Sequence, residues 1–142
     1  MAEIKKSEAE KLEIGLVRLR HHSTNQQLKG LAYLGRMGQL AQPAVPSILE
    51  LGKSENPQIR KMVTLVLGEI GEPFDLVVPA LIERLSDSDM GISHRAGVAL
   101  SELIYSRPEA HVLLQSRMST CEQALRDRIE SLVLNRLSRQ AA

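Results

Sequence analysis

The sequence is poor in aromatic residues and in cysteine. Its 142 residues include one Phe, two Tyr and no Trp. The core must therefore be aliphatic, which suits packed helices, and no aromatic platform is present to stack the bases of single-stranded nucleic acid. The single cysteine, Cys121, cannot form an internal disulfide, so we expect a fold that does not depend on an oxidising compartment.

Long apolar runs and a large excess of either charge are also missing. No run approaches the roughly 18 apolar residues of a membrane span, and the charged first 20 residues do not read as a secretory signal. We therefore expect a cytoplasmic protein that does not contact a membrane. The chain has 18 basic and 17 acidic residues, a net charge of +1. Because nucleic-acid-binding proteins usually carry a basic stripe and a high pI, nucleic acid is not an expected partner.

Two segments depart from this balance. Residues 72–90 carry five acidic side chains and one basic one, Arg84, whereas residues 117–142 carry five arginines and three acidic residues. Charge runs of this kind usually lie on the solvated face of a helix. We expect both segments to be solvated.

A repeat of 33 residues organises the chain. The pair Leu34-Gly35 recurs 33 positions later as Leu67-Gly68 and again as Leu100-Ser101, and Pro46 recurs as Pro79. A fixed period of this length is typical of a solenoid, in which each unit is too small to bury its own apolar face and stacks on its neighbours.

Each unit reads as two helices joined by a short corner. In the second unit, Asn56-Pro57 opens the first helix, Gly71 and Pro73 end it, and Asp75 is placed to cap the next helix. The spacing predicts one domain over residues 1–142 with about eight helices. Its parts are a half repeat at 7–22, repeats at 24–54, 57–87 and 90–118, and a second half repeat at 120–138.

These residues resemble the HEAT repeat family, in particular its short bacterial type. The family's pattern is a polar turn of the form D-p-d-p-x-V-R, then L-G-x-I-G, then an apolar-Pro pair. The matching segments are Ser54-Glu55-Asn56-Pro57-Gln58-Ile59-Arg60, Leu67-Gly68-Glu69-Ile70-Gly71 and Val78-Pro79-Ala80-Leu81. The first repeat has Gln27 at the arginine position, and the third has Ser93, with Arg95 displaced by two. The resemblance covers residues 25–118 and implies an all-α, right-handed solenoid of HEAT-like helix pairs with capping half repeats.

The histidines and the cysteine do not form the pattern of a catalytic or metal site. His21 and His22 are adjacent, and neighbours on a helix point about 100° apart, so both cannot face one metal. We interpret them as a polar helix end, where a histidine helps to satisfy the last carbonyls. No nucleophile, base and orienting acid occur together around Cys121 or elsewhere. The sequence therefore predicts a protein that is not an enzyme and has no cofactor or metal.

The resemblance implies that the second helices of the repeats line the concave side. Their outward positions combine apolar and charged side chains. The predicted binding residues are Arg18, Glu50, Leu51, Glu83, Arg84, Leu113 and Arg117. A mixed surface suits a protein or peptide better than a phosphate backbone.

We interpret the chain as a non-catalytic protein–protein interaction scaffold that is itself a monomer or weak dimer. Three alternatives stay open at this point. The mixed surface can be ordinary solvated helix surface. The chain can be an accessory subunit of a HEAT-like lyase or regulator that cradles a substrate protein or a prosthetic group. It can also bind nucleic acid through its arginine-bearing C-terminal helix, which predicts an affinity that falls steeply with salt.

Overall fold

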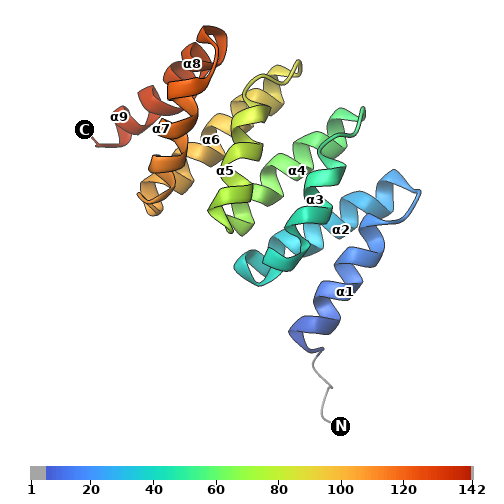
Figure 1. Cartoon of the computed structure of the whole chain (residues 1–142). Coiled ribbons are helices and arrows are strands. Elements are labelled where there is room, and N and C mark those ends of the chain that lie inside the picture. Colours follow the sequence, from blue (N-terminus) through green and yellow to red (C-terminus); the bar gives the residue numbers. More distant parts are fainter. Residues whose placement is uncertain (1–5, 142) are drawn as a thin grey trace.

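The computed structural model describes residues 6–141, and every regular element within that range is helical (Figure 1). The elements are α1 (Glu8–Leu19), α2 (Thr24–Met37), the 3-10 helix η1 (Gly38–Ala44), α3 (Val45–Leu51), α4 (Pro57–Ile70), α5 (Phe74–Arg84), α6 (Met90–Ser106), α7 (Ala110–Thr120), α8 (Gln123–Ile129), the π-helix η2 (Glu130–Leu134) and α9 (Asn135–Ala141). The all-α prediction is confirmed.

The helices form two layers. In one layer α2, α4 and α6 lie side by side in chain order, and η2 and α9 pack on α6. In the other layer α1, α3, α5 and α7 follow one another in the same order. The shared core between the layers is aliphatic, and the repeated leucines Leu34, Leu67 and Leu100 are all buried in it.

The middle pair of helices begins and ends where the sequence indicates. The Asn56 side chain accepts a hydrogen bond from the Gln58 backbone N–H at 2.9 Å, and Pro57 is the first residue of α4. At the other end Gly71 has φ +69°, a left-handed conformation that glycine adopts without a steric penalty. These boundaries confirm the predicted start and stop of the helix.

Two local predictions are wrong. Asp75 does not cap the next helix, because α5 already begins at Phe74 after Pro73, and Asp75 lies in its first turn. The count of about eight helices also fails. The corner before α3 is itself helical, as η1, and the last half repeat divides into α8, η2 and α9. The π-helix lies close to α6: a Cβ added at Gly97 would stand 2.8 Å from the Leu132 carbonyl oxygen.

No helix within residues 6–141 has the length and apolar character needed to cross a bilayer. Cys121, which follows α7, is buried as a free thiol.

Candidate functional site

A cleft of about 440 Å³ opens between α3 and α5, with α4 as its floor and α7 at one end. Its lining residues are Leu49, Gly52 and Lys53 at the end of α3, Val63 and Leu67 of α4, Asp75, Leu76, Pro79, Ala80, Glu83 and Arg84 of α5, and Arg117 of α7. The cleft lies beside the C-terminal end of α3, which stops at Leu51.

The cleft has an apolar floor and a charged rim. Val63 and Leu67 at the floor are buried in the core, and Leu76 on the wall is 37% exposed. The exposed charged side chains of the rim are Lys53, Asp75, Glu83 and Arg117. Both signs of charge are therefore present around one apolar surface, a composition found at protein interfaces.

Three of the predicted binding residues, Glu83, Arg84 and Arg117, line this cleft. Glu50 lies at its edge, exposed on α3, where its Oε1 is 3.1 Å from the Nζ of Lys53.

The other three predicted residues do not line the cleft. Leu51 and Leu113 are half-buried and pack against the core. Arg18 lies on α1 with its guanidinium carbon 5.7 Å from the centre of the Tyr33 ring, within the range of a cation–π contact. The two leucines thus form the edge of the core, and the structure does not bring the seven predicted residues together on one patch.

Arg84 is not free for binding, although the sequence predicts a solvent-facing side chain. Its Nη1 donates to the Gly52 carbonyl oxygen at 3.1 Å and to Asp87 Oδ2 at 3.3 Å. The side chain is 23% exposed. It reaches back from α5 to the end of α3 and closes one side of the cleft.

Arg117 occupies the same repeat position as Arg84, 33 residues later, but is exposed. The carbonyl equivalent to that of Gly52 belongs to Leu85, and it accepts a hydrogen bond from Arg128 Nη1 at 3.1 Å instead. In the described part of the chain the Arg117 guanidinium makes no hydrogen bond or ion pair. This side chain is therefore available to a partner.

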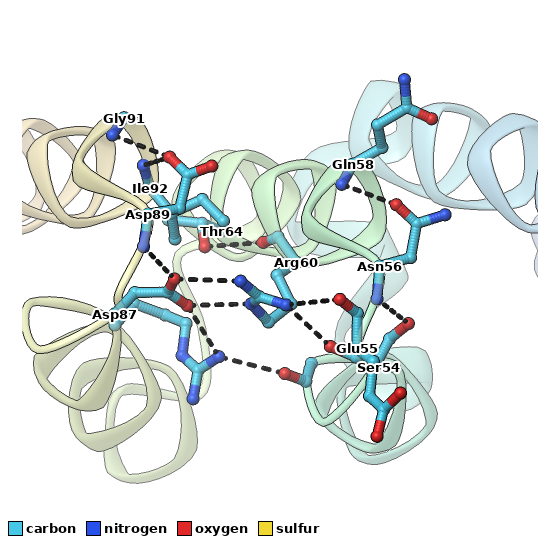
Figure 2. A network of polar contacts seen from close by, with 12 residues as sticks. Ser54, Glu55, Asn56, Gln58, Arg60, Thr64, Asp87, Asp89, Gly91 and Ile92 are labelled. Carbon is cyan, nitrogen blue, oxygen red and sulfur yellow. Dashed lines mark hydrogen bonds and ion pairs between the residues drawn. The ribbon is translucent and has the colours of Figure 1, made fainter.

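A polar network, which we call the Arg60 joint, joins Arg60 to Ser54, Glu55 and Asp87 (Figure 2). It also includes Arg84, which donates to Asp87. Nε and Nη2 of Arg60 donate to the two carboxylate oxygens of Asp87 at 3.0 and 3.1 Å. Nη1 of Arg60 donates to the carbonyl oxygens of Ser54 and Glu55 at 3.1 and 3.0 Å. One guanidinium thus connects the turn before α4 with the turn after α5.

The Asp87 carboxylate is 4% exposed, and the Arg60 side chain is 16% exposed. Burial alone would raise the pKa of Asp87. Hydrogen bonds from Arg60 and from the Asp89 backbone N–H, together with the charges of Arg60 and Arg84, outweigh burial and hold the pKa below its ordinary value. The hydrogen bond to Asp87 likewise raises the pKa of Arg60. Both groups are charged at neutral pH and form a bidentate pair.

Parts of this joint recur at the repeat period. His21 Nδ1, Ser54 Oγ and Asp87 Oδ1 each accept a hydrogen bond from the backbone N–H two residues later, at 3.1, 3.1 and 2.9 Å. Gln27 Nε2 donates to the His21 carbonyl oxygen at 2.9 Å, as Arg60 does to that of Ser54. The His21 ring therefore organises the turn after α1 and does not satisfy the last carbonyls of α1 as predicted. The 33-residue spacing contained this signal, because His21, Ser54 and Asp87 stand in register.

The two charged segments are only partly solvated, contrary to the prediction. In the acidic segment Glu72 accepts hydrogen bonds from Gln42 and Arg107, in addition to the pairing of Asp87. In the basic segment, Arg126 donates to the carbonyl oxygens of Met118 and Cys121 at 3.0 and 3.2 Å. Glu72 and Asp87 thus accept hydrogen bonds from side chains of other elements. Arg126 supplies donors to carbonyls at the end of α7 that the helix itself does not satisfy.

Within residues 6–141, no group of three or more His, Cys, Asp or Glu side chains is placed to hold a metal ion.

Comparison with known proteins indicates the fold and no family. No protein-family model and no curated protein matches the chain. A solved structure does match: the crystal structure of an engineered protein from the Northeast Structural Genomics Consortium, with a TM-score of 0.56 and 16% sequence identity. The match covers 87% of this chain, and the chain spans 61% of the length of that protein. At this identity the likeness concerns the fold alone.

Proposed function

We propose that the chain is a HEAT-like solenoid that serves as a non-catalytic scaffold and binds a protein or peptide in the cleft between α3 and α5. The observation that carries this proposal is the composition of the cleft. An apolar floor that contains Val63 and Leu67 is framed by exposed groups of both charges, Glu83 and Arg117 among them.

The mixed rim favours a protein partner over a polyanion. A phosphate backbone needs several cations that face it without nearby carboxylates, whereas Asp75 and Glu83 line this cleft together with Lys53 and Arg117. A peptide can insert an aliphatic side chain above Leu76 and place its own charged groups against the rim.

The rigid surroundings of the cleft also support binding. Arg84 is held by Gly52 and Asp87, so one wall of the cleft is fixed before a partner arrives. A surface that is already ordered loses less conformational entropy on binding. The exposed rim and the ordered wall together make the cleft a preformed site.

Affinity capture from the source cells tests the proposal with a double variant of the rim, Glu83→Lys with Arg117→Glu. Both residues are exposed, so the free energy of unfolding should change by at most about 0.5 kcal/mol for each. The charge reversal should remove the captured partner, because like charges then meet across the interface.

The matched control is Arg36→Glu with Glu69→Lys, which makes the same charge changes at exposed positions of α2 and α4 in the other layer. The control should capture the same proteins as the wild type. The proposal fails if the cleft variant captures the wild-type set of proteins, or if the wild type enriches nothing over blank resin.

A further inference from the structure

We infer that the α2–α4–α6 layer carries a second docking site, which takes an acidic segment of a partner protein with an aliphatic side chain. The site is a pocket of about 380 Å³ lined by Leu28, Gln58, Lys61, Met62, Leu65 and Arg95. We call it the Arg95 pocket. It lies on the layer opposite the cleft between α3 and α5, so the inference does not depend on the proposed function.

The charge of the Arg95 pocket has one sign. Lys61 is exposed, Arg95 is half-buried, and no acidic residue lines the pocket. The exposed Lys29 holds the position on α2 that Met62 holds on α4 and Arg95 on α6, 33 residues apart, and adds a third cation to this side. The rim of the cleft, by contrast, carries both signs.

Arg95 differs from three other partly buried arginines of the protein. Arg60, Arg84 and Arg126 donate to carboxylate or carbonyl oxygens. The Nε of Arg95 is shielded from solvent and has no hydrogen-bond partner in the described part of the chain. A shielded donor without an acceptor costs free energy. A guanidinium pairs most strongly with a carboxylate, so the pocket presents a cation that lacks its anion.

The apolar residues of the pocket favour an acidic peptide over the two other anionic partners, a membrane and nucleic acid. Leu28, Met62 and Leu65 are half-buried and recessed beside the cations. A recessed apolar surface receives a protruding side chain, whereas insertion into a membrane requires apolar side chains that project. Nucleic acid would use the cations but leave the three apolar side chains without contacts. A peptide with leucine beside glutamate or aspartate matches both parts of the pocket.

The test is a titration with a short fluorescein-labelled peptide in which two leucines are flanked by glutamates. We expect saturable binding by the wild type. Two matched peptides, with lysine in place of glutamate or serine in place of leucine, should each bind at least about tenfold more weakly, because each lacks one of the two complementary parts.

Two variants locate the site. Lys61→Glu should weaken binding at least about tenfold, because it places a like charge against the peptide. Arg95→Met keeps an unbranched apolar stem and removes the shielded Nε, so binding should fall while the melting temperature holds or rises. The control Lys11→Glu makes the same charge change at an exposed site on α1 and should leave binding unchanged.

Three results would overturn the inference. In the first, the glutamate–leucine peptide binds no better than its two matched peptides. In the second, Lys61→Glu and Arg95→Met bind the peptide as tightly as Lys11→Glu does. In the third, phosphatidylserine vesicles or duplex DNA bind the wild type more tightly than the peptide does, and Lys61→Glu and Arg95→Met weaken that binding as well. This result would assign the pocket to a membrane or to nucleic acid.

Discussion

The Arg60 joint and the rim of the cleft are two charged regions that meet along α5, and their charges are used differently. In the joint, Arg60 and Asp87 face each other, are shielded from water and have their hydrogen bonds satisfied. On the rim, Glu83 and Arg117 face solvent. Arg84 belongs to both regions: it lines the cleft, and its guanidinium donates to the Gly52 carbonyl oxygen and to Asp87.

The comparison shows that the position in the repeat does not decide whether a charged side chain is structural or free to bind. What decides it is whether an unoccupied hydrogen-bond acceptor lies close to the side chain. Arg84 and Arg117 are equivalent in the repeat, but the carbonyl of Gly52 is open to Arg84 while that of Leu85 is taken by Arg128. A charged side chain with a fixed internal acceptor stabilises the fold. One without such an acceptor is available for binding.

The largest expected effect is that of Asp87→Ala. It leaves the Arg60 guanidinium shielded without its carboxylate and removes the acceptor for the Asp89 backbone N–H. Breaking a buried ion pair by removing one partner should lower the free energy of unfolding by about 3–5 kcal/mol, measured by urea denaturation. The control Asp75→Ala removes an exposed carboxylate from the same acidic segment and should change it by at most about 0.5 kcal/mol. Equal losses in the two variants would show that the joint is no more structural than the rim.

The floor of the cleft should behave as core. Leu67 is 1% exposed and sits on the central helix of its layer. Leu67→Ala should lower the free energy of unfolding by about 2–5 kcal/mol, through lost burial and the cavity that remains. The loss should appear as a lower midpoint of thermal or urea unfolding. A loss below about 1 kcal/mol would mean that the floor yields easily and is not a fixed part of the cleft.

Acid should weaken the joint by a smaller amount. Because the pKa of Asp87 is lower in the folded protein, its ionised form contributes stability above the unfolded pKa of about 3.9, and that contribution is lost as the pH falls through the folded value. Asp87→Asn has no carboxyl to titrate. When the pH is lowered from about 6 to about 3, the free energy of unfolding of Asp87→Asn should therefore fall less than that of the wild type. Parallel pH profiles for the two proteins would contradict the assigned role of the carboxylate.

The sequence predicted those features that depend on local pattern. The start of α4 at Asn56-Pro57 and its end at Gly71 both follow from residue types that open and close helices. Whether a charged side chain forms an internal hydrogen bond or stays exposed could not be predicted in the same way. Whether Arg84 is free depends on the distance to the Gly52 carbonyl, which only the packing of α3 against α5 sets.

In the candidate site, too, some residues could be predicted from the local sequence pattern and others only from the packing of the helices. The sequence identified Glu83 and Arg117 of the cleft, because outward positions of the second helices follow the repeat. It did not identify Val63 and Leu67 as the floor of a cleft, since both residues belong to the other layer and are buried, and only the packing of α3 and α5 shows that the cleft lies above them. Leu51 was predicted to face outward and packs on the core instead.

The most direct test of the central claim compares Arg84→Ala with Arg117→Ala, the same substitution at equivalent positions of two successive repeats. Arg84→Ala removes hydrogen bonds to Gly52 and Asp87 and should lower the free energy of unfolding by about 1 kcal/mol. Arg117→Ala removes a side chain that faces solvent and should change it by less than about 0.5 kcal/mol. Equal effects, or a larger loss for Arg117→Ala, would contradict the claim that the available acceptor separates structural charges from those free to bind.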